Sequence, residues 1–192
     1  MLNKIIYFDL ETTGTNFWQH GIHQLSGIIE IDGVVKEEFN FKVAPNPLAK
    51  VEQGALDVCS VTLEQIQSYP KMGEVYKQFW QMLEKYCDKF NKLDKFFLIG
   101  FNNASFDNQF LRAWFTQNGD NYFGSWFWSN PIDVYVLSSH LLMNERHTMT
   151  DFKLKTVCQK MGIEVDETKL HDAVYDVYLT RDLYLKTINY AK

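Results

Sequence analysis

Lys4-Ile-Ile-Tyr-Phe-Asp-Leu-Glu-Thr-Thr-Gly14 is the stretch that decides the fold. Its apolar residues 5–8 are typical of a central strand that is covered on both faces. Asp9 and Glu11 follow two positions apart, and alternate side chains of a strand point to the same face. Two carboxylates at the end of an apolar strand repel each other and are costly to desolvate unless a cation lies between them. A solvated strand end is the simpler alternative for this motif taken by itself.

Further apolar stretches predict the rest of a β-sheet. Residues 22–31 and 34–43 flank Asp32-Gly33, a strong signal for a hairpin turn. Residues 96–99 predict a short fourth strand, and residues 132–136 predict either a fifth strand or the start of a helix. Helices are expected at 62–67 (with a capping-box pattern), 71–92, 105–118, 133–143, 152–161 and 172–189. This order predicts an α/β fold in which α-helices flank a mixed β-sheet.

Composition limits the class of protein. The chain has 192 residues with no repeat or linker, so we expect a single domain over residues 1–192. The sequence has no apolar run of membrane-spanning length, and its three cysteines have no zinc-binding spacing, so a cytoplasmic, intracellular protein is expected. A net charge of −5 argues against coating nucleic acid with bulk positive charge. The same net charge is compatible with a protein that holds a phosphate through bound metal ions.

Two further motifs contain groups that a metal site could use. Asn103-Ala-Ser-Phe-Asp107 follows the short fourth strand, and Asp107 stands near a helix start, where a carboxylate is also a routine partner of the helix dipole. His171 and Asp176 lie five residues apart, which is about 140° around a helix. They can converge only if His171 precedes the first full turn. A surface or capping histidine is the alternative.

Taken in order, the three motifs resemble those of the DEDD superfamily of 3′→5′ exonucleases. The histidine places the chain nearest the DEDDh branch, which includes replicase proofreading exonuclease subunits and ribonuclease T. The resemblance covers roughly residues 4–187 and implies a ribonuclease H-like fold. It implies His171 as the general base and two divalent cations, Mg²⁺ or Mn²⁺, held by the catalytic carboxylates Asp9, Glu11, Asp107 and Asp176. The family often has a histidine where this chain has Asn102, which affects substrate contacts and not the ligand set.

The same resemblance implies where substrate binds. Thr12 and Thr13 would contact the terminal 3′-hydroxyl, and Asn103 belongs to the substrate-binding motif. Side chains that would pack against or wedge between the last bases are Leu10, Leu56, Val58 and Phe106. Phe106 has the strongest physical case, because stacking on an aromatic ring tolerates any base. Core packing is an equal alternative for the three aliphatic residues, and the aromatic stretch 122–128 could either stack on substrate or pack in the core.

The function implied is a metal-dependent 3′→5′ exonuclease that releases nucleoside 5′-monophosphates. The expected partner is the 3′ end of a single-stranded nucleic acid, DNA in preference to RNA, with a polymerase or a second copy of the chain as a further partner. An exoribonuclease or oligoribonuclease is the alternative within the family. A non-catalytic nucleic-acid-binding or polymerase-associated module and a different metal-dependent phosphoesterase are the rival classes. The complete set of four carboxylates and a histidine argues against the non-catalytic module.

Overall fold

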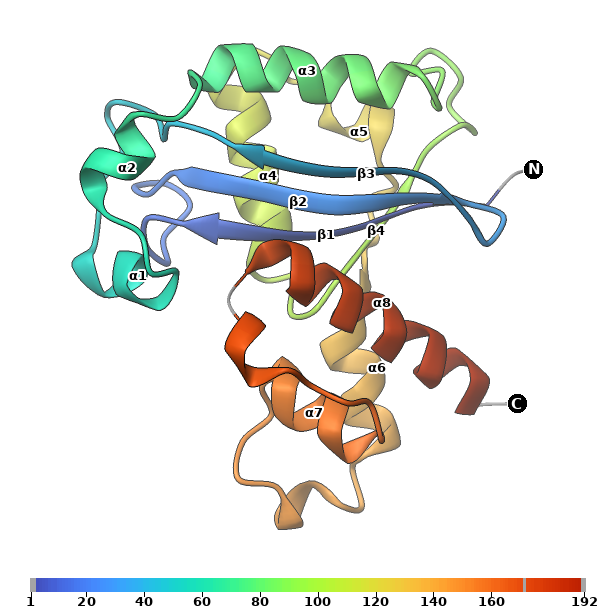
Figure 1. The fold of residues 1–192 in the computed structure, drawn as a ribbon. Helices are drawn as coiled ribbons and strands as arrows, with labels where there is room; N and C mark the ends of the chain where they lie inside the picture. Colours follow the sequence, from blue (N-terminus) through green and yellow to red (C-terminus); the bar gives the residue numbers. More distant parts are fainter. Residues whose placement is uncertain (1–2, 171, 191–192) are drawn as a thin grey trace.

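A five-stranded sheet forms the centre of the molecule in a computed structural model that describes residues 3–170 and 172–190. The strand order is β3-β2-β1-β4-β5 (Figure 1). The strands are β1 (Lys4–Thr12), β2 (Ile22–Ile31), β3 (Val34–Lys42), β4 (Phe97–Gly100) and β5 (Ile132–Asp133). β1 pairs antiparallel with β2 and parallel with β4, so the expected mixed sheet is confirmed.

Helices cover both faces of this sheet. They are α1 (Gln53–Val58), α2 (Leu63–Gln67), α3 (Met72–Glu84), α4 (Asp107–Gln117), α5 (Phe123–Trp126), α6 (Val134–Leu141), α7 (Leu154–Lys160) and α8 (Ala173–Tyr190). Short 3₁₀ turns occupy Arg146–Thr148 and Glu167–Lys169. Within the described ranges, none of the helices combines the length and the apolar character that crossing a membrane requires.

The β2–β3 hairpin forms where its turn residues predict it. Asp32 and Gly33 both have positive φ angles, 51° and 78°, as the tight two-residue turn between right-twisted strands requires. The region at residues 132–136 combines both expectations, because β5 has only two residues and α6 begins directly after it at Val134.

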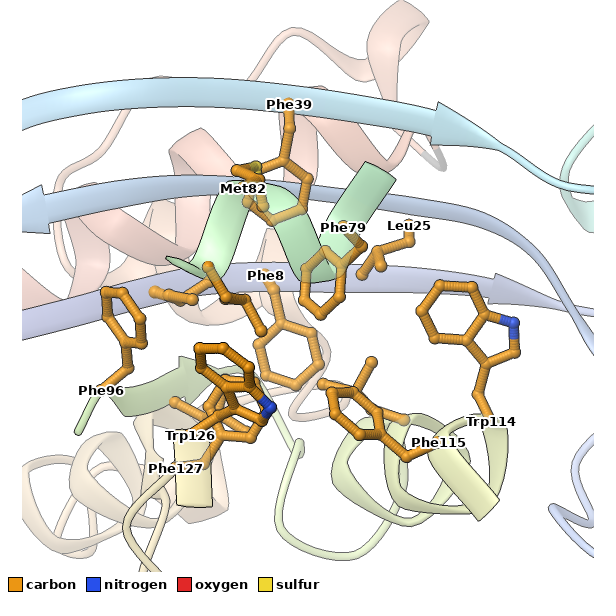
Figure 2. Packing of buried hydrophobic residues seen from close by; sticks show 14 of the residues in the cluster. Phe8, Leu25, Phe39, Phe79, Met82, Phe96, Trp114, Phe115, Trp126 and Phe127 are labelled. Carbon is orange, nitrogen blue, oxygen red and sulfur yellow. The ribbon is translucent and has the colours of Figure 1, made fainter. Parts of the chain in front are cut away.

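Alternate residues of β1 supply two separate cores. Ile6, Phe8 and Leu10 face α3, α4 and α5 and join an aromatic-rich cluster (Figure 2). Ile5 and Tyr7 point the other way and pack in a second cluster with residues of α6, α7 and α8. Asp9 and Glu11 continue this second face, so β1 directs them toward the side of the sheet that α8 covers.

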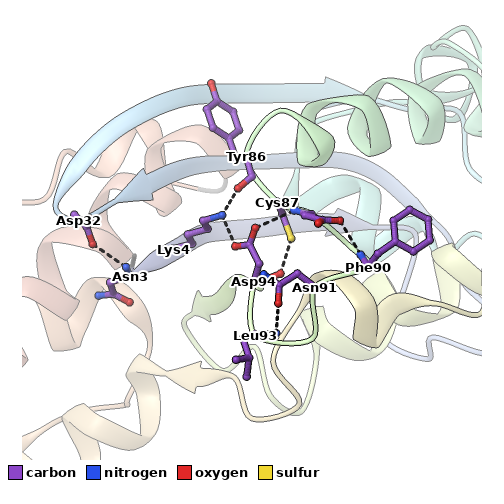
Figure 3. A network of polar contacts seen from close by, with 10 residues as sticks. Asn3, Lys4, Asp32, Tyr86, Cys87, Phe90, Asn91, Leu93 and Asp94 are labelled. Atoms are coloured by element: carbon purple, nitrogen blue, oxygen red, sulfur yellow. Dashed lines mark hydrogen bonds and ion pairs between the residues drawn. The ribbon is translucent and has the colours of Figure 1, made fainter. Parts of the chain in front are cut away.

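The sequence overestimates the length of α3. The expected helix 71–92 ends at Glu84, because the following residues form a loop closed by side-chain hydrogen bonds to the backbone. The ammonium group of Lys4 donates to the carbonyl of Tyr86 and to the carboxylate of Asp94 (Figure 3), which holds the loop against β1. Two single-turn helices, α1 and α5, were not expected from the sequence.

Candidate active site

Three carboxylates meet at the end of β1. Asp9 and Glu11 project from the strand, and Asp176 projects from the first turn of α8, which packs across β1 and β2. One carboxylate oxygen from each residue lies within 4.8 Å of the other two. All three side chains are half-buried. Residues that are 167 positions apart in the chain therefore share one acidic cluster.

Asp107 approaches the same strand from α4. It is the first residue of that helix and only 5% exposed. Its Oδ1 accepts a hydrogen bond from the backbone N–H of Leu10 across 3.2 Å. Leu10 stands between Asp9 and Glu11, so this bond ties the fourth carboxylate to the strand that carries the first two.

A sharp turn between β4 and α4 makes this approach possible. Asn102 adopts a left-handed backbone with φ 63°, a conformation that asparagine tolerates better than most residues. Asp133 fixes the turn, since its carboxylate accepts hydrogen bonds from the N–H groups of Asn102 (2.9 Å) and Ala104 (3.2 Å). The same carboxylate accepts from the N–H of Tyr135 and so caps α6.

Burial and mutual repulsion make the carboxylates hard to ionise. Burial, followed by the charges of Asp107, Glu11 and Asp176, raises the pKa of Asp9 well above its usual value. Burial raises the pKa of Glu11 to about 7, although a hydrogen bond from Cys59 acts in the opposite direction. Burial also raises the pKa of Asp107 to about 7 against the effect of two backbone hydrogen bonds. Protons or cations must therefore compensate this cluster.

The donor set fits a hard divalent cation. Asp9, Glu11 and Asp176 offer only carboxylate oxygens, which Mg²⁺ and Mn²⁺ prefer and which zinc sites usually supplement with nitrogen or sulfur. Asp107 lies beside this set through its bond to Leu10. Lys42 lowers the pKa of Glu11, but one ammonium group does not balance the charge of several converging carboxylates.

Cys59 and Lys42 lie beside the acids, and the sequence analysis did not single them out. The thiol of Cys59, directly after α1, donates to Oε2 of Glu11 across 2.9 Å. Lys42 on β3 donates to the side-chain carbonyl of Gln24, which stands opposite both Glu11 and Lys42 in the sheet register. Strand register was the one signal that could have found Lys42, whereas nothing local marks Cys59.

The residues expected to bind substrate differ in how far their side chains are exposed. Leu10 and Leu56 are buried, whereas Val58 is 54% exposed and Phe106 half-buried. The hydroxyl groups of Thr12 and Thr13 donate to the carbonyls of Gly14 and Lys50.

Asn103 and His171 are the two other residues expected in the site. Asn103 is fully buried, and its amide group donates to the side chain of Asn108 across 3.4 Å. His171 lies outside the described residues, so its role stays a prediction. α8 begins at Ala173, two residues after it.

Sequence comparison links the chain to nucleases and polymerases. The RNase T family model, described as exonuclease, matches residues 6–184. The DNA polymerase III PolC-type proteins of Thermotoga petrophila and Oceanobacillus iheyensis are 23% and 27% identical to the chain over 97% of its length. The chain spans only 12% and 11% of these relatives. The DNA polymerase III subunit epsilon of Buchnera aphidicola is 27% identical and matches 95% of the chain over 71% of its own length.

Structure comparison finds the same fold in a larger enzyme. E. coli Exonuclease I in complex with a dT13 oligonucleotide superposes with a TM-score of 0.74 at 19% identity, covering 97% of this chain and 40% of that one. The zinc-bound form of its complex with single-stranded DNA gives a TM-score of 0.76 at 20% identity, covering 99% and 41%. The ribonuclease H-like architecture expected from the motifs is confirmed.

Proposed function

The chain belongs to the RNase T exonuclease family, and from this premise we propose that it removes nucleotides one at a time from the 3′ end of single-stranded DNA. The products are nucleoside 5′-monophosphates. The observation that carries the proposal is the convergence of Asp9, Glu11 and Asp176 within 4.8 Å, with Asp107 bonded to the same strand. Such a cluster is costly for a protein that only needs to fold, and it is what a metal-dependent phosphodiesterase requires.

Each carboxylate has a role in this proposal. Asp9, Glu11, Asp107 and Asp176 hold two divalent cations, Mg²⁺ or Mn²⁺, in a two-metal mechanism. The chemistry that such cations supply is charge stabilisation on the scissile phosphate and activation of the attacking water. The cations also compensate the burial and the mutual repulsion that raise the pKa values of Asp9 and Glu11.

The remaining roles belong to polar and aromatic side chains near the acids. His171 accepts the proton of the attacking water, because imidazole is the side chain that most often serves as a general base at neutral pH. Thr12, Thr13 and Asn103 shape the pocket of the terminal nucleotide, and all three are buried next to the motifs that carry the acids. Phe106 and Val58 keep exposed surface with which to contact the last bases.

The relatives favour DNA over RNA and a polymerase as partner. DNA polymerase III proteins stand among the similar sequences, and E. coli Exonuclease I binds single-stranded DNA in the similar structures. We therefore propose that residues 1–192 act as one cytoplasmic exonuclease domain that associates with a polymerase. An exoribonuclease is the second candidate, because the description of the family model, exonuclease, specifies neither DNA nor RNA.

Paired end-labelling tests the proposed reaction. With Mg²⁺, wild-type protein should convert a 5′-labelled single-stranded DNA oligomer into a descending ladder and release a labelled mononucleotide first from a 3′-labelled one. Asp9→Ala should abolish both patterns, and His171→Ala should slow turnover severely without lowering the melting temperature. Circular single-stranded DNA should stay intact, and a matched RNA oligomer compares the two candidates. Cleavage of the circle, or an active Asp9→Ala variant, would contradict the proposal.

A further inference from the structure

A groove lies along α4, outside the acidic cluster. It has a volume of about 420 Å³ and is lined by Phe17 and Trp18 from the β1–β2 loop and by Gln109, Arg112 and Thr116 of α4. The side chain of Trp18 is 81% exposed, an unusual position for the largest apolar side chain. None of the motifs that led to the acids includes these residues.

A series of ring contacts connects this groove to the acids. Phe106 directly precedes Asp107 and contacts Phe110 with 5.0 Å between ring centroids. Phe110 contacts Phe17 at 6.4 Å, and Phe17 contacts Trp18 at 4.9 Å. Phe110 is only 2% exposed, so these contacts run through the core and place the groove close to Phe106, the residue before Asp107.

The loop that presents Trp18 is held by hydrogen bonds and is not a free tip. The side-chain oxygen of Asn16 accepts from the N–H of Trp18, and its carbonyl accepts from the N–H groups of Gln19 and His20. The imidazole of His20 accepts from the N–H of Asn16 and is buried beside Gly14, where any larger side chain would collide with the ring. The backbone that carries the indole is thus preorganised, which lowers the entropy that a ligand must overcome.

The groove also offers one positively charged side chain, Arg112. The guanidinium of Arg112 stacks on the ring of Phe123 at 4.4 Å and takes part in no ion pair with any described residue. Arg112 lies five residues beyond Asp107 on α4, which is about 140° around the helix, so its side chain lines the groove while Asp107 contacts β1.

We propose that this groove binds the nucleotides that precede the terminal one in a single-stranded substrate, with Trp18 stacking on a base and Arg112 pairing with a phosphate. The proposal rests on the proposed exonuclease function and extends its substrate site beyond the terminal nucleotide. Aromatic rings that alternate with a cation suit single strands of any sequence, because every base has a flat face and every linkage a negative charge. Proximity to Phe106 and a guanidinium that forms no ion pair with any described residue favour this occupant over a peptide.

Substrates of different length separate the groove from the acids. The p-nitrophenyl ester of thymidine 5′-monophosphate occupies only the terminal position, whereas an eight-nucleotide DNA oligomer reaches the groove. Trp18→Ala should raise the KM for the oligomer about 5- to 50-fold and leave both kcat and KM for the ester unchanged. Trp18→Phe should recover most of the loss. Arg112→Gln should raise the KM of the oligomer and weaken its salt dependence by about one counterion.

Phe90→Ala provides the matched control. Phe90 is 86% exposed but lies in the loop beside Lys4, at the opposite end of β1 from the acids, so this variant should behave as wild type. Unchanged oligomer kinetics in Trp18→Ala would overturn the proposal and leave the groove to a protein partner.

Fluorescence anisotropy of a labelled oligomer, with Ca²⁺ in place of Mg²⁺, separates the two proposals. Binding that depends on Trp18 in Ca²⁺, together with no cleavage in Mg²⁺, would contradict the exonuclease function alone. Cleavage without dependence on Trp18 would contradict the groove alone, and absence of binding by wild-type protein would overturn both.

Discussion

The thiol of Cys59 donates a hydrogen bond to Oε2 of Glu11 across 2.9 Å. This contact connects the end of α1 to the acidic end of β1, although the two residues are 48 positions apart. It stabilises the ionised form of Glu11 and so opposes the burial that raises the pKa of this carboxyl to about 7. Cys59 thereby favours the state of Glu11 that can hold a cation.

We predict that Cys59→Ala weakens Mg²⁺ binding at neutral pH. Without the thiol, Glu11 holds its proton more tightly, and protons compete with cations for a carboxylate ligand. The Mg²⁺ concentration for half-maximal activity should rise by about 3- to 10-fold near pH 7, as expected for one lost hydrogen bond. The difference should shrink near pH 8.5, where Glu11 is ionised in both proteins.

Cys59→Ser and Cys87→Ala are the controls for this measurement. A serine hydroxyl keeps a donor at the same position, so Cys59→Ser should need nearly the same Mg²⁺ concentration as wild type. Cys87 donates to the carbonyl of Asp94, away from the acids, so its removal should not change the Mg²⁺ requirement. Equal Mg²⁺ requirements in wild type and Cys59→Ala at all pH values would show that the thiol does not assist Glu11.

Metal-free protein should lose stability as the pH rises from about 5 to 8. The folded-state pKa of Asp107, about 7, lies above its ordinary value of 3.8, so the folded protein binds this proton more tightly than the unfolded chain does. The resulting stabilisation is complete below the unfolded pKa and is lost as the pH passes the folded pKa. Glu11 contributes in the same direction. Calorimetry in chelator should show the falling melting temperature, and Mg²⁺ should reverse it at high pH.

Asp107→Asn should remove part of the loss of stability that metal-free protein shows at high pH. An asparagine can still accept from the N–H of Leu10 but carries no charge, so the variant should be inactive yet melt about 3 to 8 °C higher than wild type in chelator near pH 8. Near pH 5 the two proteins should have the same melting temperature. A variant that melts lower than wild type at pH 8 would show that repulsion among the acids is not what destabilises the metal-free fold.

The parts of the fold that the sequence predicts are those with local causes. The hairpin at Asp32-Gly33 follows from turn geometry, and the shared face of Asp9 and Glu11 follows from the period of a strand. The end of α3 could not be predicted, because the loop after it depends on Lys4, which is 90 positions away from Asp94. α1 is a single turn, and the chain before it is held by a bond from Glu52 to the carbonyl of Thr13.

In the candidate site, too, the sequence predicts the features with local causes and misses those that depend on distant residues. The motifs identify the acids, but only packing of α4 and α8 against β1 decides whether Asp107 and Asp176 reach Asp9. Cys59 has no motif, and Trp18 looks like an ordinary loop residue until its exposure is known. For the aromatic stretch 122–128, the structure favours core packing over stacking on substrate, since Phe123, Trp126 and Phe127 are all buried in the core.

Asp133→Ala should lower both stability and turnover. The substitution removes the cap of α6 and both hydrogen bonds that fix the turn before Asp107, at a cost of about 2 to 4 kcal/mol. The turn should then hold Asp107 less firmly, and kcat should fall while KM changes little. Urea denaturation and steady-state kinetics measure the two effects, with Asp133→Asn as an intermediate case. A loss of stability with unchanged kcat would show that the turn is not needed to position Asp107.

Glu30→Gln should lower stability without affecting turnover. Both Nε and Nη2 of Arg181 donate to Oε2 of Glu30, which is 4% exposed, so this pair anchors α8 to β2. Glu30 lies opposite Ile5 in the sheet register, whereas Asp9 lies opposite Ser26 nearer the other end. Loss of the pair should cost about 1 to 3 kcal/mol, because Arg181 retains some contact with water.

Because the acids lie beyond this anchor, kcat at 25 °C should stay near the wild-type value while the melting temperature falls by about 3 to 8 °C. The double variant Glu30→Gln/Arg181→Met tests the cause, since removing the unpaired charge as well should restore part of the stability. If Glu30→Gln instead lost activity at a temperature where it is fully folded, α8 would have to carry Asp176 out of position when its anchor weakens. The pair would then control the geometry of the acidic cluster as well as the stability of the fold.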